Sequence, residues 1–124
     1  MDISILATKL NRAGVGGKAL EFLLSFLSNR SQKVRVGNSL SVARRVRSGV
    51  PQGSVLGPVL FLVYIADLQM SHSGNIAKLL KYVDDSKMLT RVNTEEDVFQ
   101  LQNDLGKIYK WAELNHMRWN DLKF

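Results

Sequence analysis

The chain has 124 residues, 45% of them hydrophobic, with no cysteine and a formal net charge of +6. This length suits one small domain or part of a larger one. Without cysteine there is no disulfide framework, no disulfide partner and no thiolate metal site. Residues 2–13 mix Lys and Asn with apolar positions, so no signal peptide is predicted and no membrane partner is expected.

Two helices are predicted at the start of the chain. Residues 1–13 place Ile5, Leu6 and Leu10 on one side, and Gly14 is a stop signal. A second helix is predicted over residues 18–28. It carries a leucine stripe at helical spacing, typical of a core-facing surface, formed by Leu20, Leu23, Leu24 and Leu27.

A basic β-hairpin is predicted next, with strands over residues 32–36 and 42–47 and a turn at Gly37–Ser39. Six basic residues and no acidic residue occur between the first and the last of them, namely Arg30, Lys33, Arg35, Arg44, Arg45 and Arg47. Such a cluster suits the phosphates of a nucleic acid. A solvated hairpin with basic decoration explains it equally well, and the residues alone leave both interpretations open.

A Gly/Pro-rich loop is predicted over residues 48–58, without regular structure. Its glycines allow close approach to a ligand, and exposed amides can meet phosphate oxygens, although a plain connecting loop has the same composition. Pro58 suits the first turn of a helix. That helix is predicted to run to about Met70 and to be buried, because residues 59–65 are all apolar.

Two adjacent carboxylates, Asp84 and Asp85, are predicted at the tip of a second β-hairpin. Apolar runs of strand length flank them, over residues 76–83 and 88–92. An ionised pair of this kind needs water or a cation, and carboxylate oxygens suit Mg²⁺. Asp is also common in ordinary turns, so a plain turn is the alternative.

The last predicted helix is capped by Asn93 or Thr94 and has acidic residues in its first turn. Its apolar positions predict one face lying on a sheet, formed by Val98, Leu101, Leu105, Ile108 and Ala112. A short strand is predicted at residues 117–119. The element order predicts an α+β fold, with a small antiparallel sheet backed by helices.

At this point the sequence resembles a known family. The run Gly49–Pro58, which reads GVPQGSVLGP, is followed by Leu60-Phe61 and later by Tyr82–Asp85, which reads YVDD. Together with residues 26–34 and 111–123, these motifs resemble the reverse transcriptases (RNA-directed DNA polymerases) of non-LTR, LINE-like retrotransposons. The resemblance covers nearly the whole chain and implies the palm of a right-hand polymerase.

The resemblance also implies roles for particular residues. Asp84 matches the family's catalytic, metal-binding aspartate and Asp85 its companion, while Tyr82 matches a residue beside the primer end. Pro51, Gln52 and Gly53 match the loop against the template and the incoming nucleotide, and Lys123 matches a lysine near the leaving phosphate. The implied reaction is transfer of a dNTP onto a DNA primer along an RNA template, with Mg²⁺ or Mn²⁺ in the complete enzyme.

The chain departs from the family pattern in several respects. The family's other metal-binding aspartate lies on a strand that would precede Met1, the fingers and thumb are missing, and Ala66 stands where an Asn is usual. We therefore expect residues 1–124 to form a single partial domain, a palm fragment inactive by itself. A non-catalytic RNA-binding module and a functionless remnant of a decayed element are the alternatives. The implied location is intracellular, with the nucleus as a candidate compartment.

Overall fold

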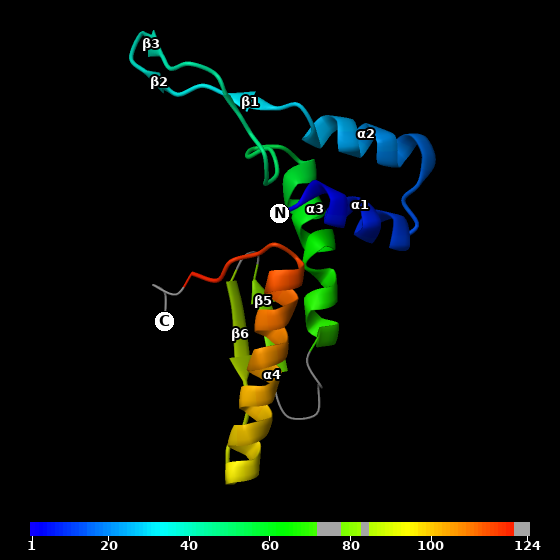
Figure 1. The fold of residues 1–124 in the computed structure, drawn as a ribbon, viewed down its shortest axis with the longest axis vertical. Helices are drawn as coiled ribbons and strands as arrows, with labels where there is room; N and C mark the ends of the chain where they lie inside the picture. Colours follow the sequence, from blue (N-terminus) through cyan, green and yellow to red (C-terminus); the bar gives the residue numbers. More distant parts are fainter. Residues whose placement is uncertain (72–77, 83–84, 121–124) are drawn as a thin grey trace. The chain divides into compact units, whose positions relative to one another are not determined.

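The computed structural model describes residues 1–71, 78–82 and 85–120 (Figure 1). The chain divides into two compact units, Met1–Val63 and Tyr64–Phe124, which are described separately below. We call them unit 1 and unit 2. The expectation that residues 1–124 form one partial domain stays a prediction.

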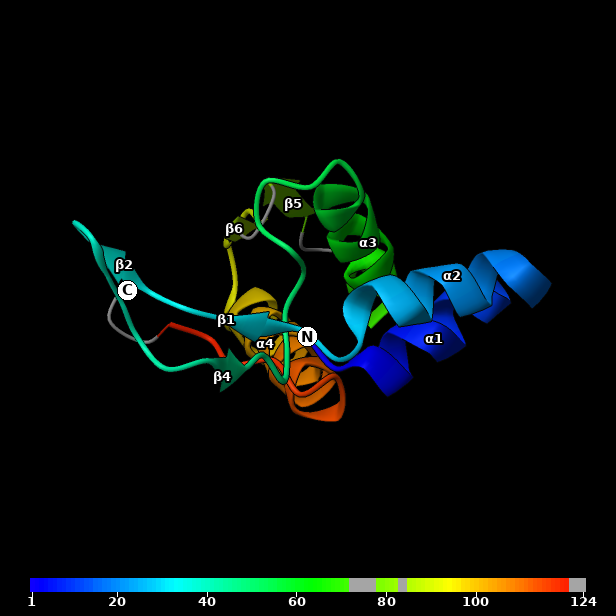
Figure 2. The same cartoon turned by 90° about the horizontal axis from the view of Figure 1, so that it is seen from above.

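Unit 1 begins with two helices, α1 (Ile3–Arg12) and α2 (Gly17–Leu27), which lie side by side (Figure 2). The Asp2 side chain caps α1 by accepting hydrogen bonds from the backbone N–H groups of Ser4 and Ile5. Gly14, at φ +88°, ends α1 in the left-handed conformation that glycine adopts without steric cost. Both predicted helices are therefore confirmed, and both their ends follow from local signals.

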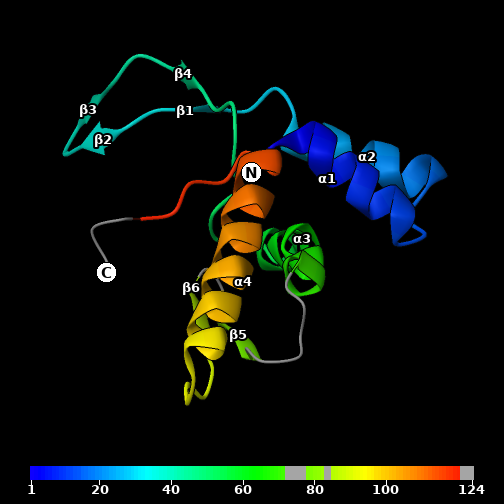
Figure 3. The same ribbon diagram turned by 60° about the horizontal axis from the view of Figure 1, so that its bottom comes forward.

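The predicted basic hairpin is present as two short antiparallel strand pairs. At its base β1 (Ser31–Gln32) pairs with β4 (Arg44–Arg45), and near its tip β2 (Arg35–Val36) pairs with β3 (Ser39–Leu40). Because Val36 pairs with Ser39, Ser39 belongs to β3 and not to the turn. In Figure 3 the hairpin extends away from α1 and α2. We call it the β-ribbon, residues 30–46.

Helix α3 (Leu56–Tyr64) begins inside the stretch that was predicted to lack regular structure, and it ends earlier than predicted. A separate 3₁₀ helix, η1 (Ala66–Ser71), follows it. The prediction of a fully buried helix was also wrong. Leu60 is buried, but Val59 is 53% exposed and Leu62 57% exposed, because no other element of the described chain covers that side of α3.

Unit 2 consists of η1, a hairpin of β5 (Lys78–Tyr82) and β6 (Asp85–Leu89), and the long helix α4 (Glu95–Leu114). Figures 1 and 3 show α4 lying alongside the hairpin. Thr94 caps α4 in a reciprocal arrangement. Its hydroxyl accepts from the Asp97 N–H, and the Asp97 carboxylate accepts from the Thr94 N–H. This result confirms the predicted start of the helix.

The buried face of α4 differs from the predicted one. Ile108 and Ala112 are buried as expected, but Val98 is 52% exposed, and the face also contains Asp104 and Trp111. The face is rotated relative to the apolar stripe because η1 packs against α4, with the Trp111 indole donating to the Asp67 carboxylate.

The short strand expected at residues 117–119 is not formed. Helix α4 instead ends in a Schellman motif, in which the Met117 N–H donates to the Ala112 carbonyl and the His116 N–H to the Glu113 carbonyl. His116 takes a positive φ of 49° at this turn. The chain after α4 thus leaves the helix through a backbone turn and not through a sheet.

The secondary structure confirms the α+β class, with helices and small antiparallel sheets. Among the helices that the structure describes, none is both long and apolar enough to cross a membrane.

Candidate functional site

The hairpin predicted around the paired aspartates is confirmed, but its register places Asp85 within a strand. Tyr82 and Asp85 form the last residue pair before the turn, so Asp85 begins β6 and does not lie at the tip. Val83 and Asp84 lie outside the described residues, as does Lys123. Directly opposed residues of an antiparallel pair share one face of the sheet. The Asp85 carboxylate therefore stands beside the Tyr82 ring, which is 81% exposed.

The opposite face of the hairpin is turned inward. It carries Leu79, which is 7% exposed, and Lys81, which pairs with Ser86 one step from the Tyr82–Asp85 pair. The ammonium group of Lys81 lies 3.3 Å from the carbonyl oxygen of Ile65 and 3.5 Å from that of Ala66. These bonds fasten the end of the hairpin nearest the aspartates to the short connection between α3 and η1.

The same connection also holds α4. The Trp111 indole donates to the Asp67 carboxylate at 3.0 Å, and the Tyr64 hydroxyl donates to the Asn115 carbonyl at 2.5 Å. Asn115 in turn donates from its side chain to the Trp111 carbonyl. Residues 64–67 are thus the point where the hairpin and the C-terminal end of α4 are joined. The sequence offers no local signal for this junction, since its partners are as far as 51 residues apart.

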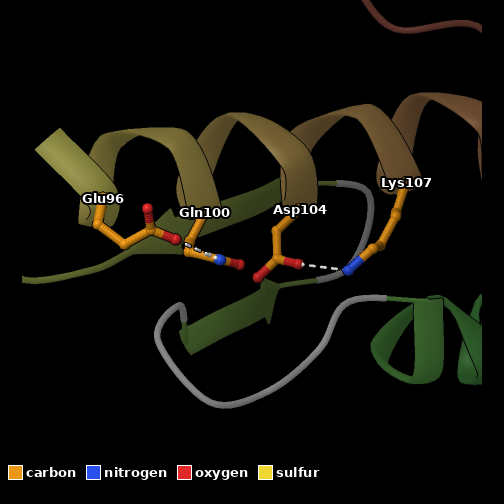
Figure 4. Close-up of polar contacts among 4 residues, drawn as sticks. All are labelled: Glu96, Gln100, Asp104 and Lys107. Atoms are coloured by element: carbon orange, nitrogen blue, oxygen red, sulfur yellow. Dashed lines mark hydrogen bonds and ion pairs between the residues drawn. The ribbon is translucent and has the colours of Figure 1, made fainter.

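A row of polar side chains follows one side of α4 (Figure 4). Gln100 donates to Glu96 at 2.8 Å, and Lys107 forms an ion pair with Asp104 at 3.0 Å. The Asp104 side chain is only 3% exposed, whereas that of Lys107 is 41% exposed. A buried carboxylate is costly unless it is paired, so Lys107 gives Asp104 the partner that its burial requires. The burial of Asp104 was not predicted, because only apolar residues were expected on this face.

The Gly/Pro-rich loop of unit 1 forms a defined turn. The Ser54 N–H and hydroxyl both hydrogen bond to the Pro51 carbonyl, which places Gln52 and Gly53 at the centre of a β-turn. Gly53 has φ +78°, the value that the third position of a type II turn requires. Gln52 and Gly53 are both exposed. Their predicted contact with template and nucleotide stays a prediction.

The turn is locked onto the start of α3. The Ser54 hydroxyl accepts from the Gly57 N–H at 3.0 Å and so caps the helix. A Cβ atom at Gly57 would lie 2.9 Å from both the Pro51 carbonyl oxygen and the Ser54 hydroxyl oxygen. Gly57 is therefore needed for packing between loop and helix. Gly53 has nothing within 4 Å of a would-be Cβ, so only its backbone conformation restricts the residue there.

The six basic residues are not equivalent in the structure. Arg30 is half-buried, and its guanidinium donates to the carbonyls of Leu27 and Gly49 at 2.9 and 2.6 Å. It therefore joins the end of α2 to the beginning of the Gly/Pro-rich loop. The other five are exposed: Lys33, Arg35, Arg44, Arg45 and Arg47.

No described residue belongs to a group of three or more His, Cys, Asp or Glu side chains placed to hold a metal ion. Asp85 is among the described residues, whereas Asp84 is not.

Comparison with known proteins gives the family. Over 97 residues, 73% of this chain, the sequence is 40% identical to the probable RNA-directed DNA polymerase from transposon BS of Drosophila melanogaster. The chain is related to the RNA-directed DNA polymerases of non-LTR transposons. It is also 34% identical over 79% of its length to the probable polymerase from transposon X-element, and 33% identical over 77% to that from mobile element jockey, both of D. melanogaster.

These matches confirm the resemblance to reverse transcriptases that the sequence motifs indicated. In each case the matched segment spans 11% of the length of the transposon polymerase. No protein-family model matches the chain, and no solved structure matches it.

Proposed function

We propose that this chain is the palm segment of a reverse transcriptase encoded by a non-LTR retrotransposon. In the complete enzyme it would take part in the transfer of a dNTP to the 3′-hydroxyl of a DNA primer along an RNA template. The observation that carries this proposal is the 40% identity to a transposon polymerase over 97 residues. The α+β composition and the β5–β6 hairpin, whose second strand begins with Asp85, support it.

The donor set of the hairpin fits a divalent cation. The carboxylates of Asp84 and Asp85 are hard oxygen donors of the kind that Mg²⁺ and Mn²⁺ prefer, and Asp85 is exposed at the start of β6. When bound, such an ion would neutralise charge on the reacting phosphate. The role of Tyr82 would be to lie beside the primer end, on the same face as Asp85.

The remaining sequence-predicted residues have positioning roles in this proposal. The turn at Pro51, Gln52 and Gly53 would offer backbone amides to the template and the incoming nucleotide, and Lys123 would lie near the leaving phosphate. Two-metal transfer needs carboxylates that converge from separate strands, whereas Asp84 and Asp85 are adjacent in the sequence. We therefore expect the 124-residue chain to extend no primer by itself.

Replacing the matching segment of a transposon polymerase by residues 1–124 tests the proposal. We expect this chimaera to extend a labelled primer on a homopolymeric RNA template. Asp84→Asn should abolish extension, and Asp85→Asn should reduce it less. Glu96→Gln is the matched control, because it removes the same charge from an exposed position on α4 and should leave the rate unchanged.

Two results would contradict the proposal. Equal activity of the chimaera and its Asp84→Asn variant would show that this aspartate is not at the catalytic centre. Loss of activity in the Glu96→Gln control as well would show that the chimaera responds to charge or folding and not to the site.

A second candidate function is non-catalytic RNA binding, favoured by the five exposed basic residues on and beside the β-ribbon. In that case the 124-residue chain would bind RNA, but its chimaera would show no Asp84-dependent extension. A remnant without function would do neither. For either functional role we propose an intracellular protein, with the nucleus as the candidate compartment.

A further inference from the structure

The β-ribbon exposes more apolar surface than an ordinary hairpin in water. Val34, Val36, Leu40 and Val42 are 62%, 74%, 63% and 74% exposed, and they surround its tip. An isolated two-stranded hairpin is only marginally stable, and clustered exposed apolar side chains commonly mark a binding surface. The tip therefore has the character of a surface that a partner covers.

Charge identifies the chemistry of that partner. The base of the β-ribbon carries Arg44 and Arg45 in β4, and no acidic residue occurs between Arg30 and Arg47. Arg44 and Arg45 are adjacent in a strand, so they project from opposite faces. Positive charge on both faces complements a polyanion that flanks the ribbon on two sides.

The apolar side chains of the tip are also divided between the two faces. Leu40 is paired with Arg35 on one face, and Val36 is paired with Ser39 on the other. A flat protein surface would cover only one of these faces. The walls of a duplex groove contact both, since the major groove of B-form DNA admits a two-stranded ribbon and minor-groove proteins insert apolar wedges.

We propose that the β-ribbon enters a groove of a nucleic-acid duplex, with Arg44 and Arg45 on the phosphates and Val36 and Leu40 against the apolar parts of sugars and bases. This inference rests on the proposed function in so far as the partner is a nucleic acid. It adds a mode of contact, in which apolar side chains at the tip, and not only charge, distinguish a duplex from a single strand.

Fluorescence anisotropy of the 124-residue chain with a labelled B-form DNA duplex of about 20 base pairs, and with one of its strands alone, tests the proposal. The salt concentration is varied from about 50 to 200 mM, over which phosphate contacts lower the affinity by orders of magnitude. The tip variant is Val36→Thr with Leu40→Thr, which keeps strand propensity and removes apolar surface. The base variant is Arg44→Gln with Arg45→Gln. The control is Val55→Thr, at a valine 88% exposed outside the ribbon.

We expect the tip variant to bind the duplex about tenfold more weakly with an unchanged salt dependence, and to bind the single strand as the wild type does. The base variant should lose affinity for both and flatten the salt dependence by about one unit of slope for each contact removed. Val55→Thr should match the wild type. Circular dichroism of each variant checks that the helices are retained.

The alternatives give different results. If the base variant is weakened but the tip variant is not, the tip does not enter a groove, although nucleic-acid binding stands. If the wild type binds neither probe, the nucleic-acid partner is wrong. If the wild type self-associates in sedimentation and the tip variant does not, a second copy covers the tip, and the inference is overturned.

Discussion

The hydrogen bonds at residues 64–67 predict how much stability is lost when the Tyr64 hydroxyl is removed. Tyr64 is fully buried, and its hydroxyl donates to the carbonyl of Asn115, a residue that is only 7% exposed. The Tyr64→Phe substitution keeps the ring and its packing but removes the donor. The Asn115 carbonyl then loses its hydrogen bond from Tyr64 in a place that water does not readily reach.

The size of the effect follows from that burial. Leaving a buried acceptor without its donor costs about 1–3 kcal/mol, which exceeds the average net worth of a hydrogen bond because water cannot replace the lost partner. For a unit of this size, each kcal/mol lowers the melting temperature by about 4–8 °C. Tyr64→Phe should therefore lower the melting temperature of unit 2 by at least about 4 °C.

Thermal unfolding, for the melting temperature, and urea unfolding, for the free energy of unfolding, can both be followed by tryptophan fluorescence, because Trp111 and Trp119 lie in unit 2. The chain supplies two matched controls. Tyr109 is 51% exposed and Tyr82 is 81% exposed, so the same Tyr→Phe change at either should alter the free energy of unfolding by less than about 0.5 kcal/mol. Tyr109→Phe also preserves the ring that lies 6.1 Å from that of Trp119.

Comparison of the three Tyr→Phe variants decides whether the Tyr64 hydroxyl stabilises unit 2 through a buried hydrogen bond. Equal stability of the three Tyr→Phe variants would show that the Tyr64 hydroxyl does not contribute through a buried hydrogen bond. A large effect at Tyr109 with none at Tyr64 would place the important contact on the exposed side of α4 instead.

Two further predictions concern helix ends and glycines. Hydrogen bonds from the Asn93 N–H, and from the Thr94 side chain and N–H, lower the pKa of Asp97 from its usual 3.8. Because the pKa of Asp97 is lower in the folded state, its stabilisation of the fold is present above pH 3.8 and is lost as the pH falls through the folded-state pKa. The helicity of α4, measured by circular dichroism, should therefore decline less steeply in that pH range in the Asp97→Asn variant than in the wild type. Gly57→Ala should destabilise the chain in thermal unfolding, since its Cβ would lie 2.9 Å from the Pro51 carbonyl oxygen. Gly106→Ala, in the middle of α4 and with no atom within 4 Å of its Cβ, should stabilise the chain by about 0.5–1 kcal/mol. The opposite order of stabilities would contradict the packing argument.

Several features were predictable because near neighbours in the chain determine them. Asp2 accepts from the N–H groups two and three residues later, and Thr94 and Asp97 are three residues apart. Gly14 needs only its own freedom to take a positive φ. The turn at Gly37 and the apolar runs that flank the paired aspartates are equally local, so both hairpins were predicted before their registers were known.

Other features were wrongly predicted, and each depends on partners distant in the sequence. The burial of a helix face depends on what packs against it. Apolar residues at 59–65 therefore predicted a buried helix, although Val59 and Leu62 remain exposed. The position of Asp85 at the start of β6, and not at the tip of the hairpin, is similar, since register depends on the partner strand as well as on composition.

The amino-acid sequence by itself determined the start of α4, the two hairpins and the motifs that relate this chain to transposon polymerases, because these depend on interactions over a few residues or on the residue order alone. Only the tertiary structure decided that Arg30 bonds to the Gly49 carbonyl, that Trp111 donates to Asp67 across 44 positions, and that Asp104 is buried beside Lys107. The physical reason is that burial removes water as a competing partner. A polar group then needs a specific neighbour, and folding, not proximity in the sequence, supplies it.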